Sequence, residues 1–348
     1  MNYMQKLFLT AKRVAIGSTE VDVDAPPFVG LSDCSACPNP CVDDDHPRYP
    51  SYLKINQTMP LLHSVKPYER HVLISTGKED WEGHIDSDKS SLAFYLQNAI
   101  DKGQQRLRES DNGQPVYRIV LTNSSRMADT WDGPGWQVVV LPDQIIVNNV
   151  TPDQCDDFYE AFLEPPFEGA WGQSPVGGAV LKNQEVTATA QDGTNSNTST
   201  GPSASTGGVD HSNLPLNREV KAGKTTFTAH RWQAKAAIMI CSHKKRDKRC
   251  GVTAAILKKE FTRILRSKDL LGDAEGDVEI WLVSHIGGHK FAGNVIVHRG
   301  GVSIWYGRVE PCHSHAIVDS TIERGEIIRD LYRGGANGHM EAYKQTSW

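Results

Sequence analysis

Residues 236–265 read AAIMICSHKKRDKRCGVTAAILKKEFTRIL, and this stretch decides the expected fold. The apolar run at 236–241 predicts a buried strand, because polar residues bound it closely. The charged residues 242–249 predict a loop, and the apolar spacing over 252–265 predicts an amphipathic helix. A second apolar run, VEIWLVS at 278–284, completes a β-α-β unit whose two strands are parallel neighbours.

The chain repeats this order of elements. After the β-α-β unit, the sequence predicts a hairpin of 294–297 with 302–306 around a Gly-Gly turn, and then a closing helix over 314–332. The first half predicts the same series, with a strand, a helix, a strand, a hairpin and a helix at 71–75, 90–106, 116–122, 136–148 and 151–163. This is the element order of thioredoxin-like folds, so we expect an α/β protein made of two thioredoxin-like halves.

A polar segment divides the two halves. Residues 187–212 are nearly free of large apolar side chains and cannot bury enough surface to offset the entropy of ordering them. The predicted divisions are an N-terminal extension, a first thioredoxin-like domain, a flexible linker, a second thioredoxin-like domain and a tail, at 1–27, 28–184, 185–217, 218–340 and 341–348.

The composition argues against several classes of protein. Lys and Arg number 37 against 42 Asp and Glu, so no surplus of cations is present to neutralise the phosphates of a nucleic acid. No apolar run approaches the roughly 20 residues that span a bilayer. The first 18 residues are basic and hold no acid, which is compatible with a weak mitochondrial presequence. We expect instead an ordinary terminus and a reducing cytoplasmic location, with mitochondria as the alternative.

Four residues of the second half are predicted to converge. Cys241 ends the first strand and Cys250 lies at the start of the following helix. His285 ends the second strand, and His289 follows it across a glycine pair. Loops that leave the carboxyl ends of neighbouring parallel strands lie side by side, so all four side chains can face one site.

Two thiols and two imidazoles are an inventory of metal ligands, and the spacing alone leaves three interpretations open. They are a 2Fe-2S cluster with a Rieske-type ligand set, a Cys2His2 zinc site, and buried thiols beside hydrogen-bonded histidines. Eight residues separate Cys241 from Cys250, a longer gap than in short zinc motifs, and it suits a group larger than a single ion.

Three motifs and the C-terminal residue resemble the fungal sucrase/ferredoxin-like family. The motifs are ICSHKKRDKRCG at 240–251, HIGGHKFAGN at 285–294 and IWYGRV at 304–309, and the chain ends on Trp348. The resemblance covers most of the second half and, more loosely, the first. It implies that the second half is a thioredoxin-like ferredoxin domain. By the same resemblance, we expect links to oxidative stress, metal tolerance and actin-patch organisation.

The resemblance also implies a 2Fe-2S cluster, held by Cys241, Cys250, His285 and His289. Two neutral imidazoles in place of two thiolates remove two negative charges, so the potential is expected above that of four-cysteine ferredoxins. Each imidazole keeps a second nitrogen that can carry a proton, which couples electron transfer to pH. We expect a one-electron carrier and leave open whether the chain is also an enzyme.

A second group of cysteines gives an alternative function. Cys34, Cys37 and Cys41 form a CxxCxxxC motif near His46. They suggest a second metal or redox site, and the alternative function is a thiol oxidoreductase that works through Cys34 and Cys37. We favour an ordinary loop of reducible thiols, since nothing but His46 offers a fourth ligand. The third possibility is a zinc-stapled interaction protein, that is, a protein-binding domain whose fold a zinc ion stabilises.

Five other candidate ligands are expected to play no part in metal binding. Cys155 and Cys312 are expected to be core or surface thiols. His243, His313 and His315 lack the flanking glycines of the predicted ligand loop.

Two segments predict protein partners. The loop between the two cysteines carries five cations and predicts a docking surface for an acidic redox partner, a reductase of unknown identity: Lys244, Lys245, Arg246, Lys248 and Arg249. The terminal Thr-Ser-Trp resembles the short C-terminal peptides of clients of the cytosolic iron–sulfur assembly machinery. This resemblance predicts that Trp348 recruits the targeting complex of that machinery.

Overall fold

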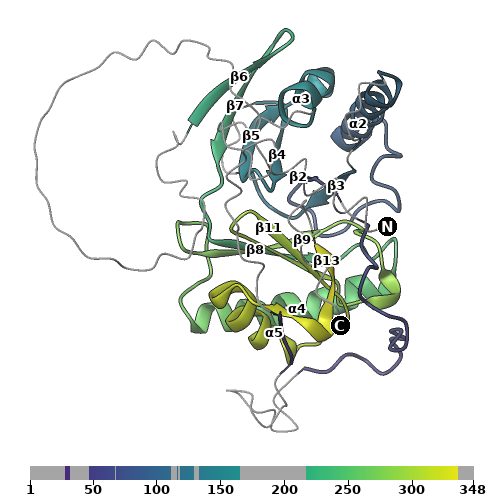
Figure 1. The fold of residues 1–348 in the computed structure, drawn as a ribbon, viewed down its shortest axis with the longest axis vertical. Coiled ribbons are helices and arrows are strands. Elements are labelled where there is room, and N and C mark those ends of the chain that lie inside the picture. Colours follow the sequence, from purple (N-terminus) through teal and green to yellow (C-terminus); the bar gives the residue numbers. More distant parts are fainter. Residues whose placement is uncertain are drawn as a thin grey trace, which may run out of the picture. The chain divides into compact units, whose positions relative to one another are not determined.

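The computed structural model describes residues 28–31, 47–66, 68–110, 116, 118–128, 133–164 and 217–335. Within these ranges the protein is a mixed α/β structure with one large sheet, a two-stranded pairing and a few helices (Figure 1). None of the described helices is both long and apolar enough to cross a bilayer. The predicted extension, the predicted tail, the predicted linker up to residue 216 and the CxxCxxxC motif lie outside the described residues, whereas Asn217, the last residue of the predicted linker, begins a strand.

The strands of the first half form one side of the large sheet. β2 Arg70–Ser75 has the parallel strand β3 Ile119–Ser124 on one flank and the antiparallel strand β4 Trp136–Leu141 on the other. β5 Ile145–Val150 pairs with β4, which gives the order β3-β2-β4-β5. The sequence predicted all four strands, because each is a short, largely buried apolar run.

Two helices of the first half also lie where they were predicted. α2 Leu92–Glu109 begins after Ser91, whose side chain accepts a hydrogen bond from the Phe94 N–H and so caps the helix. α3 Cys155–Phe162 follows a single 3₁₀ turn, Pro152–Gln154. The buried face of each helix packs on the same face of the sheet, where Val72, Val138 and their neighbours lie.

The strands of the second half repeat the same order. β8 Ala236–Cys241 has the parallel strand β9 Val278–Val283 on one flank and the antiparallel strand β10 Val295–Arg299 on the other. β11 Val302–Tyr306 pairs with β10, so the order is β9-β8-β10-β11. The predicted β-α-β unit and hairpin are confirmed.

The helix of this unit begins earlier than predicted. α4 Lys248–Ser267 starts four residues before the expected position 252, because the Asp247 side chain caps it by accepting from the Arg249 N–H. Cys250 therefore lies in the first turn of the helix.

The prediction of a closing helix over 314–332 is wrong in its second part. The helix comprises α5 His313–Ala316 and a wider π-helical continuation, η4 Ile317–Arg324, and it ends at Gly325, whose φ of 74° is left-handed. The chain then becomes extended, because its later residues form two short strands that pair with other strands. These strands are β12 Ile327–Ile328 and β13 Tyr332–Gly335, separated by the 3₁₀ turn Arg329–Leu331. β13 pairs with β11, and β12 with β1 Phe28–Val29.

A hairpin that the sequence did not predict extends the first half. β6 Asn217–Ala222 and β7 Thr225–Arg231 pair with each other, and β7 pairs with β5. Residues that follow the polar segment in sequence therefore belong to the same sheet as the first-half strands (Figure 1).

The strands of the two halves pack face to face, and they are also joined at one edge. The sheet continues from one half to the other through a single pairing of Ser124 with Val283, between β3 and β9. One apolar core lies between the two groups of strands and includes Leu73 and Met239. α2 and α3 cover the outer face of the first-half strands, and α4 and α5 cover that of the second (Figure 1). Alternate residues of each strand thus face a helix layer and the central core.

Candidate metal centre

The four predicted ligands lie on adjoining loops of the second half. Cys241 is the last residue of β8, and Cys250 lies in the first turn of α4. His285 follows β9, and His289 begins the 3₁₀ turn η3 His289–Phe291. The two cysteines are buried, with 1% exposure each, whereas His285 is half-buried and His289 is exposed. The predicted site therefore extends from the interior to the surface.

The side chains contact one another in series. The thiol of Cys250 donates a hydrogen bond to the sulfur of Cys241, and this bond lowers the pKa of Cys241 well below its ordinary value. The His285 side chain and the Ile286 N–H lower that pKa as well, while burial opposes them. The bond to Cys241 and burial both raise the pKa of Cys250. The rings of His285 and His289 lie 5.5 Å apart between centroids. The structure thus brings the four residues together pairwise.

One atom at this site lacks the partner that its burial demands. Nδ1 of His285 is buried and makes no hydrogen bond within the described residues. Buried polar atoms are almost always paired, so a free imidazole nitrogen beside a low-pKa thiol fits a metal ligand. Among the described residues, however, no group of three or more His, Cys, Asp or Glu is arranged to hold a metal ion.

The loop between the two histidines depends on glycine. Gly287 and Gly288 have φ values of 82° and 74°, in the left-handed region that other residues rarely adopt. At Gly288 a Cβ atom would lie 2.2 Å from Nη2 of Arg333, so a side chain there would displace the guanidinium. The glycine pair predicted from the sequence therefore has both a conformational and a packing cause.

His243 holds the backbone of a predicted ligand. Its Nδ1 accepts a hydrogen bond from the His285 N–H at 3.1 Å, and its Nε2 donates to the carbonyl oxygens of Trp81 and Glu82 at 3.0 and 2.7 Å. Both ring nitrogens are engaged, so His243 has no lone pair left for a metal. Local sequence patterns could not predict this role, because Trp81 and Glu82 lie more than 150 residues away in the chain.

A segment of the first half clamps the loop between the two cysteines. This clamp segment, residues 79–84, receives a hydrogen bond from Ser242 Oγ to Glu79 O and another from the Lys245 N–H to the Asp80 carboxylate. Lys245 also forms an ion pair with Glu82. The clamp segment carries none of the predicted ligands. It contacts the loop that connects two of them, Cys241 and Cys250.

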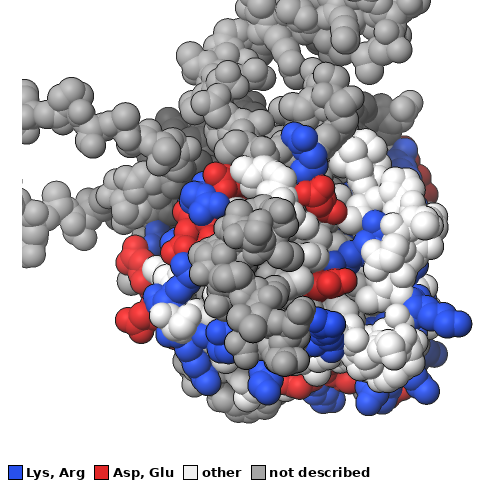
Figure 2. Space-filling model, turned by 90° about the horizontal axis from the view of Figure 1, so that it is seen from below, with Lys and Arg blue, Asp and Glu red and all other residues white. Residues whose placement is uncertain are grey.

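The predicted basic docking surface is partly neutralised. Lys245 pairs with Glu82, and Arg249 pairs with Asp247 at 2.8 Å. Seen from the side of α4 and α5, Lys and Arg side chains are interspersed with Asp and Glu (Figure 2). The cations that remain without a carboxylate partner within the described residues include Arg246, which donates to the Gly83 carbonyl oxygen.

The charges of this loop act on His289. Burial lowers the pKa of His289, Asp247 opposes this effect, and Arg249 and Arg246 add to it. The charged side chains of Asp247, Arg249 and Arg246 therefore lie within electrostatic range of this imidazole.

Three of the other candidates occupy structural positions. Cys155 is buried in α3, and burial raises the pKa of its thiol to about 12. His313 Nδ1 accepts from the Glu310 N–H at the start of α5, and His315 contacts Arg263. Cys34, Cys37, Cys41, His46 and Trp348 lie outside the described residues.

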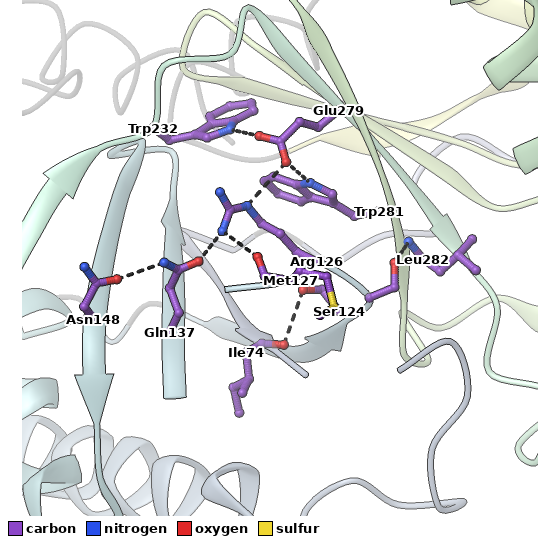
Figure 3. Close-up of polar contacts among 11 residues, drawn as sticks. Ile74, Ser124, Arg126, Met127, Gln137, Asn148, Trp232, Glu279, Trp281 and Leu282 are labelled. Atoms are coloured by element: carbon purple, nitrogen blue, oxygen red, sulfur yellow. Dashed lines mark hydrogen bonds and ion pairs between the residues drawn. The ribbon is translucent and has the colours of Figure 1, made fainter. Parts of the chain in front are cut away.

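A buried polar network joins the two halves away from this site (Figure 3). The Glu279 carboxylate accepts from the indole N–H of Trp232 at 2.6 Å and from that of Trp281 at 2.8 Å, and it pairs with Arg126 at 3.4 Å. Arg126 also donates to Gln137. Arg126 and Glu279 have opposite charges, and both indole N–H groups have an acceptor. We therefore assign to this network a structural role at the seam, the contact between the two halves.

Comparison with known proteins points to one family. The model of the sucrase/ferredoxin-like family matches residues 61–334. A Debaryomyces hansenii protein, altered inheritance of mitochondria protein 32, is 47% identical over 277 residues, which cover 78% of this chain and 83% of the relative. Actin patches distal protein 1 of Saccharomyces cerevisiae is 30% identical over 280 residues, 78% of this chain and 74% of the relative.

Some matches are shorter. A Meyerozyma guilliermondii protein, also called altered inheritance of mitochondria protein 32, is 45% identical over 102 residues. That match covers 29% of this chain and only 35% of the relative's length. No solved structure matches the chain.

Proposed function

We propose, from the premise that this chain belongs to the sucrase/ferredoxin-like family, that it is a one-electron carrier with a 2Fe-2S cluster. The observation that carries the proposal is the buried thiol pair beside an imidazole whose Nδ1 has no hydrogen-bond partner within the described residues. Thiolates and imidazoles are together the ligand set of a high-potential 2Fe-2S centre.

Four residues would hold the cluster: Cys241, Cys250, His285 and His289. When bound, a 2Fe-2S cluster accepts one electron and returns it. The hydrogen bonds that lower the pKa of Cys241 favour its thiolate, the form that binds iron. His243 holds the His285 backbone in place, and the left-handed glycine pair lets the loop turn back toward the cysteines.

We also infer that each half is thioredoxin-like. The strand orders β3-β2-β4-β5 and β9-β8-β10-β11 are the same, with a parallel first pair followed by an antiparallel hairpin in each. Such a repeat supports an ancient duplication in which only the second half carries the ligands. The first half contributes the clamp segment instead.

Proton coupling is part of the proposal. Reduction adds negative charge next to the two imidazoles and raises their affinity for a proton. His289 is exposed and can exchange that proton with solvent. The midpoint potential is therefore expected to fall as pH rises, by at most about 59 mV per pH unit for one proton per electron.

The exposed edge at His289 suggests where a redox partner docks. Arg246 and Arg249 contribute to lowering the pKa of His289, so positive charge lies near this edge and favours an acidic surface on the partner. Reduction by an acidic flavoprotein reductase should slow with rising salt in the wild type, and it should slow at constant salt in Arg246→Glu.

Trp348 is proposed to recruit the targeting complex of the cytosolic iron–sulfur assembly machinery. The test is to delete Trp348 and to measure iron in the protein from cells together with the stability of the purified protein. Less iron at unchanged stability supports recruitment, and full iron loading contradicts it.

The location and wider role follow as proposals. Recruitment by a cytosolic machinery places the chain in the cytoplasm, with mitochondria as the alternative, and cell fractionation distinguishes the two. The names of the relatives mention inheritance of mitochondria and actin patches. We extend these roles, with tolerance of oxidative stress and metals, to this chain as hypotheses that growth of a deletion strain tests.

The absorption spectrum of the purified full chain tests the function. A 2Fe-2S cluster gives visible charge-transfer bands with equal amounts of iron and sulfide, and these should be lost in Cys241→Ser and Cys250→Ser. Cys155→Ser, a buried thiol of the first half, is the matched control and should keep them. Colourless protein with bound zinc would instead support a zinc-stapled interaction protein. Colourless, metal-free protein that reduces disulfides would support the thiol oxidoreductase.

A further inference from the structure

Arg333 is a buried cation of the second half. It lies on β13 and is 1% exposed. Its guanidinium donates to Ser64 Oγ at 3.0 Å and to Asn294 Oδ1 at 2.7 Å, with longer contacts of 3.4 Å to the carbonyl oxygens of Gly287 and Ser64. Every one of these acceptors is neutral.

No carboxylate among the described residues forms an ion pair with Arg333. Burial lowers the pKa of Arg333 to about 10, and the groups that oppose this effect are the thiols of Cys241 and Cys250. A buried charge is strongly disfavoured unless an opposite charge or a set of hydrogen bonds compensates it. Asn294, which Arg333 contacts through its side chain, also accepts a hydrogen bond from the Cys241 N–H at 3.0 Å, so a single residue links the cation to a predicted thiolate ligand.

The guanidinium also packs against the loop that carries the two histidines. Nη2 lies where the missing side chain of Gly288 would begin, and Asn294, which binds Arg333, also donates to the Gly288 carbonyl oxygen at 3.0 Å. The guanidinium carbon lies 5.5 Å from the centroid of the Phe291 ring. Arg333 therefore has a fixed place beside the ligand loops, shielded from solvent.

We propose that Arg333 is the buried counter-charge of the metal centre, which holds the glycine loop and raises the midpoint potential. This inference rests on the proposed 2Fe-2S function. The electron comes from the redox partner, and Arg333 exchanges neither electrons nor protons. Its fixed positive charge stabilises the added negative charge, because a desolvated interaction is screened far less than one in water.

Potentiometry of the full-length, cluster-loaded protein tests the proposal. Arg333→Gln removes the charge and should lower the equilibrium constant for one-electron reduction at least tenfold, which equals about 59 mV. Arg333→Lys keeps the charge and should stay within about threefold of the wild type. The matched control is Arg308→Gln, since Arg308 also lies over the Phe291 ring, at 5.1 Å, but is more exposed. It should change the constant less than threefold.

A second variant keeps the charge effect measurable if Arg333→Gln binds no cluster. Asn294→Asp leaves the guanidinium in place and adds a negative charge on the atom that it contacts, so it should lower the same constant at least tenfold. An unchanged constant in Arg333→Gln or in Asn294→Asp overturns the proposal. Loss of the cluster in both Arg333→Gln and Arg333→Lys, with equal loss of apoprotein stability, would show a structural role only and would also overturn it. A colourless wild type would overturn the proposed function itself.

Discussion

Two buried histidines of the central core should make the protein sensitive to acid. Burial lowers the pKa of His71 to about 3, with smaller contributions from His298 and Arg118, and burial lowers that of His298 to about 3 as well. The unfolded chain binds a proton at each near pH 6.5, so it takes up more protons than the folded chain between pH 6.5 and 3. Stability contributed by the neutral histidines is complete above pH 6.5 and is lost as pH falls. At pH 5 each histidine should lower the free energy of unfolding by about 2 kcal/mol relative to its value above pH 6.5.

Urea unfolding of the wild type and of His298→Asn at pH 7.5 and pH 5.0 isolates this effect. An amide does not titrate, so the wild type should lose about 2 kcal/mol more than the variant over this interval. The pH dependence, not the absolute stability, is the quantity to compare, because the substitution also removes the 2.9 Å contact of His298 with Ser303. His63→Asn, at an exposed position, is the control and should not alter the difference. Equal losses in wild type and His298→Asn would refute the reasoning.

Three further predictions follow from the site and the seam. His285→Cys and His289→Cys should each keep a cluster but lower its midpoint potential, because each adds a negative charge; an unchanged or higher potential would argue against histidine ligation. His243→Ala should reduce the iron content of the purified protein and cost about 1–3 kcal/mol in urea unfolding, since it leaves the His285 N–H without its acceptor. Glu279→Gln should cost about 3 kcal/mol in urea unfolding, because it removes the carboxylate charge that pairs with Arg126 in a buried network, whereas Lys102→Gln, which breaks an exposed pair, should cost nothing measurable.

Local patterns predicted the strands β2 to β5 of the first half and β8 to β11 of the second. The run AAIMIC predicted a strand over 236–241, and β8 has these bounds, because a short run that is buried on both faces is apolar throughout. The predicted ligands lie at the ends of β8 and β9, where loops of a parallel pair adjoin. The sequence could therefore place them near one another. Whether they bind a cluster is still a prediction.

Contacts between distant segments were beyond the reach of local patterns. The apolar spacing of 314–332 suits a helix, but Gly325 ends the helix and the later residues pair as strands. The hairpin of β6 and β7 follows the polar segment yet completes the sheet of the first half. The same holds for the site, where His243 and Arg333 act through partners far away in sequence.

The measurement that tests the central claim most directly is pulsed electron paramagnetic resonance of the reduced protein, labelled with ¹⁵N only at histidine. Ligation by His285 and His289 predicts two strong nitrogen couplings to the unpaired electron, and each His→Cys variant should lose one of them. A paramagnetic cluster without histidine nitrogen couplings would contradict the ligand set. The absence of any such signal from iron-replete, reduced protein would contradict the electron-carrier function itself.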